Sequence, residues 1–88
     1  FFLDTLGWVY LKLGRGDEAV RILRQAVEKA PKQPVFNYHL GMAYFRGGEA
    51  TPARLYLEKA VHAGKAFPGL EEARTVLTAL NTKRIGER

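Results

Sequence analysis

Residues 36–61, FNYHLGMAYFRGGEATPARLYLEKAV, decide the fold because they repeat residues 2–27, FLDTLGWVYLKLGRGDEAVRILRQAV, at a constant offset of 34 positions. Between residues 1–30 and 35–64, nine of the thirty aligned pairs are identical, whereas ordinary composition would give about two. The identities are glycines and apolar residues: Phe2/Phe36, Leu6/Leu40, Gly7/Gly41, Tyr10/Tyr44, Gly14/Gly48, Ala19/Ala53, Leu23/Leu57, Ala26/Ala60 and Val27/Val61. A period of this length predicts stacked copies of one structural unit.

Each copy predicts two helices joined by a glycine turn. In the first copy, apolar residues recur at the spacing of one helical face: Leu3, Leu6, Tyr10 and Leu13. Gly14 interrupts this pattern, and Asp17 then suits the N-cap of a second helix that ends before Pro31. In the second copy Gly47-Gly48 makes the interruption, and Thr51-Pro52 predicts an N-cap followed by the first helical residue.

Residues 67–81 predict one further helix that is not a third copy. Pro68 suits the start of this helix, and its apolar residues form one narrow stripe: Leu70, Ala73, Leu77 and Leu80. A helix with one apolar and one polar face is what the end of a stacked array requires, because no further unit covers it. Residues 82–88 lack periodicity, so we expect them to form a flexible tail.

Both copies carry the same set of glycine, aromatic and small positions: Leu6-Gly7-x-x-Tyr10 with Ala19, Leu23 and Ala26, then Leu40-Gly41-x-x-Tyr44 with Ala53, Leu57 and Ala60. This set resembles the tetratricopeptide repeat family. The resemblance implies an all-α fold in which helical hairpins stack into a right-handed α–α superhelix. It places one repeat at residues 1–33, a second at 34–66, a capping helix at 67–81 and the tail at 82–88.

Gly7 and Gly41 lie in the middle of predicted helices, where glycine costs about 1 kcal/mol relative to alanine. Their recurrence one period apart predicts a close approach of two helices, with each glycine facing the alanines of the second helix in its hairpin. Leu3 and Asn37 depart from the family pattern, because they stand where the first helix usually carries Trp.

Composition argues against catalysis and metal binding. The chain of 88 residues has no cysteine, and its two histidines, His39 and His62, are not spaced as a metal-ligand pair. Neither glycine turn follows a predicted strand, as a phosphate-binding loop would. We therefore expect a non-catalytic protein without a cofactor or metal ion. No run of about 18 apolar residues occurs, so we also expect no membrane span.

By resemblance, the first helix of each repeat lines the concave side of the superhelix. The positions that face this groove are Asp4, Trp8, Leu11 and Lys12, then Tyr38, Met42, Phe45 and Arg46, with His39 adjacent. Aromatic and Met side chains on a concave face suit recognition of a peptide or partner protein, so the expected function is a protein-interaction scaffold. The alternative for these side chains is packing against the capping helix or a neighbouring repeat. Asp4 and Trp8 stand where chaperone-binding members carry Lys and Asn, so capture of a chaperone's acidic C-terminus is not expected.

The formal net charge of +5 raises a helical nucleic-acid-binding module as the alternative function. Such a module would use a basic face formed by Arg15, Arg21 and Arg24. Phosphate binding requires a concentrated basic stripe, whereas the basic residues here are spread along the chain and accompanied by acids. Nucleic acid is therefore the less favoured partner.

Phe1 and Phe2 present an apolar end with no preceding Met. We expect the chain to be a piece of a longer array whose preceding repeat covers this end, and the isolated chain to form a homodimer through its N-terminal hairpin. A narrower resemblance, on residues 3–8, 38–40, 67–68 and 72–73 before Leu77, is to the C-terminal ends of long bacterial repeat proteins, among them repeat lipoproteins associated with exopolysaccharide and exosortase systems. It implies a scaffold in or near the cell envelope, while the residues themselves do not distinguish envelope, periplasm and cytoplasm.

Overall fold

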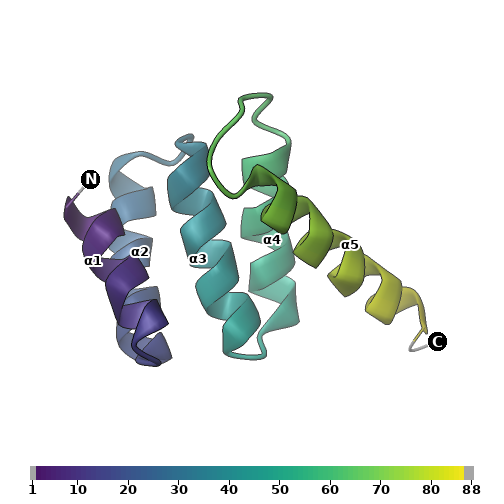
Figure 1. Cartoon of the computed structure of the whole chain (residues 1–88), viewed down its shortest axis with the longest axis horizontal. Coiled ribbons are helices and arrows are strands. Elements are labelled where there is room, and N and C mark those ends of the chain that lie inside the picture. The colour runs from purple at the N-terminus through teal and green to yellow at the C-terminus, as the bar shows by residue number, and fades with distance from the viewer. Residues whose placement is uncertain (1, 87–88) are drawn as a thin grey trace.

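The computed structural model describes residues 2–86, and side chains for residues 2–82. This part of the chain forms five α-helices and no strand: α1 (Phe2–Lys12), α2 (Gly16–Lys29), α3 (Pro34–Arg46), α4 (Ala50–Val61) and α5 (Leu70–Gly86). α1 and α2 form one antiparallel hairpin, α3 and α4 form a second, and α5 packs against the second hairpin (Figure 1). The predicted all-α class is confirmed, with α1 and α3 in one layer and α2 and α4 in the layer behind it.

Both hairpins turn through the same backbone geometry, one period apart. Gly14 and Gly48 adopt φ values of 82° and 80°, which glycine reaches without steric strain. The N–H of Arg15 then donates to the Tyr10 carbonyl at 2.9 Å, and the equivalent bond in the second hairpin is 3.0 Å long. This arrangement is a common glycine C-cap, so the repeat in the sequence is also a repeat of backbone geometry.

The second helix of each hairpin begins earlier than the sequence predicts. The N-cap residue is Arg15 for α2 and Glu49 for α4, so the predicted caps Asp17 and Thr51 are wrong and lie in the first helical turn. The physical reason is that the glycine turn needs only one further residue before the chain becomes helical. The carbonyl of Arg15 already accepts the first intrahelical bond, from the N–H of Ala19 at 3.0 Å.

The core is built from the repeated positions. Leu23 and Leu57 are fully buried, one in each hairpin. A Cβ added to Gly7 would lie 2.5 Å from Leu23 Cγ, and one added to Gly41 would lie 2.8 Å from Leu57 Cγ. The predicted close approach of the helices is confirmed, although a leucine rather than the predicted alanines faces each glycine.

Asn37 ties the loop between α2 and α3 to the body of the fold. Its Nδ2 donates to the carbonyl of Pro31 at 2.9 Å and to the carbonyl of Gln33 at 3.3 Å. Only 2% of the residue is exposed. Hydrogen bonding to loop carbonyls therefore explains why a polar residue occupies this buried position.

α5 differs from the predicted capping helix at both ends. It begins at Leu70, after Gly69 turns the chain with a φ of 100°, rather than near Pro68. It runs to Gly86, so residues 82–86 are helical and are not part of a flexible tail, while residues 87–88 lie outside the described part. Backbone hydrogen bonds carry the helix past its last core residue, because no helix-breaking residue intervenes. Its apolar stripe is buried, as a cap requires: Ala73, Leu77 and Leu80.

Candidate functional site

α1 and α3 bring predicted groove residues together. The two helices are the first of their hairpins and lie in one layer (Figure 1). Asp4 lies in the first turn of α1 and Trp8 one turn later, while Tyr38 and His39 lie in the first half of α3. Residues of the two repeats therefore meet between the hairpins.

Asp4 and His39 form a buried hydrogen-bonded pair. His39 Nδ1 lies 2.8 Å from Asp4 Oδ1 and 2.9 Å from Oδ2, and the side chains of Asp4 and His39 are only 9% and 12% exposed. Because carboxylate oxygens only accept hydrogen bonds, Nδ1 carries a proton. The pair thus fixes the imidazole and directs Nε2 away from Asp4.

Aromatic rings form a continuous row from α1 to the loop before α5. The Trp8 and His39 rings are stacked, with centres 4.0 Å apart and planes inclined by 22°. The Tyr38 ring lies 5.7 Å from Trp8 and 5.6 Å from Phe67. Ring contacts at these distances are favourable, so the row holds the indole of Trp8 in one orientation.

The start of α5 covers one end of this row. The Tyr38 hydroxyl donates a hydrogen bond to the Glu72 carboxylate, and a Cβ on Gly69 would collide with the Tyr38 ring. Burial, and then the hydrogen bond and charge of Glu72, raise the pKa of Tyr38 above its ordinary value of 10.0, while Arg46 acts in the opposite direction. Because Gly69 and Glu72 cover its ring and hydroxyl, Tyr38 is only 4% exposed. The start of α5 therefore already fills this part of the predicted groove.

The nine predicted groove residues therefore divide by exposure. Four are buried: Asp4, Leu11, Tyr38 and Met42. Five remain accessible in full or in part, and we call them the Trp8 face: Trp8, Lys12, His39, Phe45 and Arg46. Lys12 Nζ lies 5.2 Å and Arg46 Cζ 5.9 Å from the centre of the Trp8 ring. The Trp8 face thus combines a flat aromatic surface with two cations.

A protein-family comparison bears on the repeat seen in the sequence and in the backbone. A family model described as Tetratricopeptide repeat matches residues 5–71, which span most of α1, all of α2 to α4 and the first residues of α5. The chain belongs to the tetratricopeptide repeat family. No curated protein and no solved structure matches it significantly. Tetratricopeptide repeats generally mediate protein–protein interaction and act as non-catalytic scaffolds.

The basic residues of the first tetratricopeptide hairpin do not form a concentrated stripe. Arg15 Nε donates to Glu18 at 2.6 Å, and the guanidinium lies 5.1 Å from the centre of the Tyr10 ring. Arg21 and Arg24 are exposed on α2. The predicted alternative of nucleic-acid binding therefore gains no support from this face.

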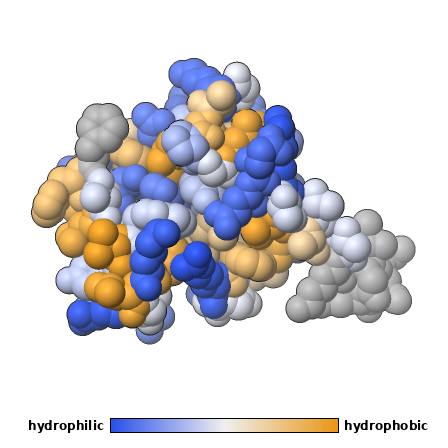
Figure 2. Space-filling view, viewed as in Figure 1, coloured by the Kyte–Doolittle hydropathy of each residue, from blue (hydrophilic) through white to orange (hydrophobic). Residues whose placement is uncertain are grey.

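The N-terminal end of the repeat array carries an apolar stripe. Phe1 lies outside the described residues, and Phe2 is 76% exposed. Val9 is 47% exposed, and Leu13, directly after α1, is 66% exposed. Figure 2 shows apolar surface over the region of α1 at the left edge of the molecule. The sequence pattern places Leu13 on the apolar face of Leu3, Leu6 and Tyr10, but this residue follows the end of α1 and is exposed. Val9 was not predicted as a surface residue, although the helical spacing of Val9 and Leu13 from Phe2 places all three on one face.

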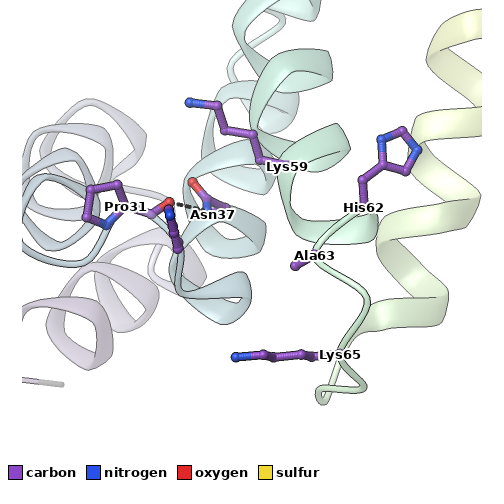
Figure 3. Close-up of a pocket in the computed structure, with 7 residues that line it drawn as sticks. Pro31, Asn37, Lys59, His62, Ala63 and Lys65 are labelled. Carbon is purple, nitrogen blue, oxygen red and sulfur yellow. Dashed lines mark hydrogen bonds between the residues drawn. The ribbon is translucent and has the colours of Figure 1, made fainter.

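A pocket that the sequence did not predict lies between the loop joining α2 to α3 and the segment after α4 (Figure 3). It has a volume of about 570 Å³, and we call it the inter-loop pocket: Pro31, Lys32, Asn37, Lys59, His62, Ala63 and Lys65. These residues come from distant segments, so no local pattern could have indicated the pocket.

In the part of the chain that the structure describes, His, Asp and Glu side chains do not gather in any group of three able to hold a metal ion. None of the helices in this part of the chain has the length and apolarity needed to cross a bilayer.

Proposed function

We propose that the chain is a protein-interaction module whose Trp8 face binds an acidic segment of a partner protein. The observation that carries this proposal is the position of Lys12 and Arg46. Both cations lie near the Trp8 ring, and neither forms an ion pair with a described side chain. Carboxylates of a partner would form charge-assisted hydrogen bonds with them, and the indole would contact the apolar part of the same segment.

Two carboxylates close to the Trp8 face are already engaged within the fold. Asp4 is held by His39 at 2.8 Å, and Glu72 accepts the hydrogen bond of Tyr38. The positive charge of Lys12 and Arg46 is therefore available to a partner. Charge complementarity of this kind raises the rate of association and selects acidic partners over basic ones.

The Trp8 face is also rigid before any partner arrives. The stack on His39, at 4.0 Å, and the bond from His39 to Asp4 fix Trp8 from beneath. Binding to a preorganised aromatic surface loses little side-chain entropy, so more of the contact energy is realised as affinity.

Fluorescence anisotropy of labelled peptides tests this proposal. Two probes of equal length are used, one rich in Glu and Leu and one in which every Glu is replaced by Gln. We expect the Glu peptide to bind more tightly, and Lys12→Ala/Arg46→Ala to weaken its binding by about tenfold or more, because hydrogen bonds to charged groups contribute about 1.5–3 kcal/mol.

The matched control is Arg21→Ala/Lys29→Ala, which removes the same charge from exposed positions on α2. This variant should bind the Glu peptide as the parent does. Equal weakening in both double variants would show a general charge effect and would overturn the assignment to the Trp8 face. Equal affinity for the Glu and Gln peptides would overturn the acidic partner.

We further propose that the stripe of Phe2, Val9 and Leu13 is a stacking surface for another repeat hairpin, since each unit of such an array buries its apolar face on a neighbour. In the isolated chain a second copy supplies that hairpin, giving a homodimer. Sedimentation equilibrium at increasing concentration should show dimers that Val9→Ser/Leu13→Ser abolishes. A parent chain that stays monomeric at millimolar concentration would contradict this.

The same stripe supports the proposal that the chain is part of a longer repeat protein, in which another hairpin takes this position. The likeness of residues 3–8, 38–40, 67–68 and 72–73 with Leu77 to bacterial repeat lipoproteins supports a bacterial envelope scaffold. Expression of the intact parent with an epitope tag, followed by membrane fractionation, tests this origin, and a parent found wholly in the soluble fraction would contradict it.

A further inference from the structure

The inter-loop pocket shares no residue with the Trp8 face. Asn37 lies in the first turn of α3, whereas Arg46 lies in its last turn. A second hollow of about 440 Å³ continues the pocket and shares Pro31, Lys32 and Lys65 with it. The volume of about 570 Å³ for the inter-loop pocket itself is that of a small-molecule site, since such sites occupy about 300–1,000 Å³.

One wall of the pocket is held rigid. Asn37 Nδ2 fastens the loop through the carbonyls of Pro31 and Gln33, at 2.9 and 3.3 Å. Pro31 and Pro34 restrict the backbone of the same loop, because their rings lock φ. The loop N–H of Gln33 also bonds the Ala30 carbonyl at 3.1 Å. A ligand would therefore meet a preformed wall.

The same amide carries a buried acceptor without a partner. Because Nδ2 faces two carbonyl oxygens, the orientation of the amide is determined, and Oδ1 points the other way. Figure 3 shows this oxygen on the side of Lys59. Oδ1 is buried and has no hydrogen-bond partner among the described residues. Such atoms are rare in native folds, and each calls for a donor.

The remaining lining is strongly basic. Three lysines and His62 contribute side chains, and no carboxylate belongs to the lining: Lys32, Lys59, Lys65 and His62. None of the lysines takes part in an ion pair with a described side chain. Lys59 instead places its ammonium 5.2 Å from the centre of the Tyr56 ring. Three lysines thus line a hollow whose other lining residues include no carboxylate to neutralise them, and this excess of positive charge attracts an anion.

We propose that the inter-loop pocket binds a phosphate-bearing small molecule. Lysine binds phosphate groups as a compact point charge with three donors, and three lysines line the pocket. A phosphate presents several anionic oxygens at once, so it engages more than one lysine. The ammonium of Lys59 has three donors and can bridge a phosphate oxygen to Asn37 Oδ1, which supplies the missing donor. This inference does not depend on the proposed function of the Trp8 face.

Titration of the ¹⁵N-labelled chain with pyrophosphate, followed by amide chemical shifts, tests the proposal. We expect saturable shifts concentrated at residues 32–33 and 62–65. Lys59→Ala/Lys65→Ala should weaken pyrophosphate binding by about tenfold or more, equivalent to about 1.4 kcal/mol. The control Arg21→Ala/Lys29→Ala removes the same charge from exposed positions of α2 that belong to neither the pocket nor the Trp8 face, and it should leave the affinity within about twofold of the parent.

Thermal unfolding of each variant confirms that it folds, and the exposed positions of all four substituted residues make loss of the fold unexpected. A phosphoserine peptide and sulfate complete the comparison. Shifts spread over all lysine-bearing surfaces, or equal weakening in both double variants, would show unspecific ion binding and overturn the site. Tighter binding of the phosphopeptide than of pyrophosphate would overturn the small-molecule ligand, and equal binding of sulfate would overturn the preference for phosphate.

Discussion

Replacing Gly41 by alanine probes the tightest contact in the second hairpin. A Cβ at this position would lie 2.8 Å from both Cγ and Cδ2 of Leu57 and 3.1 Å from the Leu57 backbone nitrogen. Leu57 is fully buried, so its side chain has no open space to move into. The backbone nitrogen can retreat only if α4 moves away from α3, which loosens the packing along both helices.

The expected loss follows from two opposing terms. Overpacking a core costs about 1–3 kcal/mol, while alanine in a helix interior is favoured over glycine by about 1 kcal/mol. Gly41→Ala should therefore lower the free energy of unfolding by up to about 2 kcal/mol. Each kcal/mol corresponds to about 4–8 °C in Tm for a domain of this size. Gly41→Leu places a whole isobutyl group in the same space, and we expect it to unfold the chain.

Far-UV circular dichroism during thermal and urea unfolding measures both variants. The control is Gly16→Ala, because a Cβ at Gly16 meets no atom within 4 Å and alanine there should be neutral or slightly stabilising. The reasoning is refuted if Gly41→Ala melts at or above the parent temperature, as the control should. A Gly41→Leu chain that melts within a degree or two of the parent would refute it equally.

Three other substitutions probe the contacts around the groove. Gly69→Ala places a residue with a Cβ at a positive φ and pushes that Cβ against the Tyr38 ring, so we expect the Tm to fall by several degrees. An unchanged Tm would contradict the docking of α5. Asp4→Ala leaves the buried Nδ1–H of His39 without its acceptor, so the free energy of unfolding measured in urea should fall by about 1–3 kcal/mol. A smaller fall than in the control Asp17→Ala would contradict the pairing. Tyr38 holds its proton in the folded state above the pH at which the unfolded phenol ionises, so the stability of the parent should fall by up to about 1.4 kcal/mol per pH unit once the pH rises above about 10. Tyr38→Phe should flatten that slope in urea unfolding curves recorded from roughly pH 9 to 11, and an equal slope in both chains would contradict the assignment.

Local patterns in the sequence were sufficient for the helical hairpins and their register. The face spacing and the turn glycines Gly14 and Gly48 depend on residues close together in the chain, and the period of 34 residues appears when the sequence is aligned with itself. Gly7 and Gly41 also predicted one feature of the tertiary packing. Glycine destabilises a helix interior, so its recurrence at the same position of both copies indicated that two helices approach closely there. The N-caps were misplaced because Asp17 and Thr51 are good capping residues in isolation, whereas the glycine turn sets where the helix can begin.

Only the tertiary structure decided which groove residues remain accessible. Family resemblance placed Tyr38 and Trp8 alike on the concave side, yet Tyr38 is buried under α5 while Trp8 keeps an accessible ring beside Lys12 and Arg46. The direction in which α5 leaves Gly69 depends on its contacts with Tyr38, which lies 34 residues before Glu72 in the chain.

The inter-loop pocket is likewise a product of the tertiary structure. Its lysines stand in separate segments and become neighbours because the loops before α3 and after α4 lie at one end of the second hairpin. Periodicity and capping are properties of neighbouring residues, so the sequence alone determines the hairpins. Burial, and the gathering of charge at a surface, depend on contacts between distant segments, and these follow only once the helices are docked.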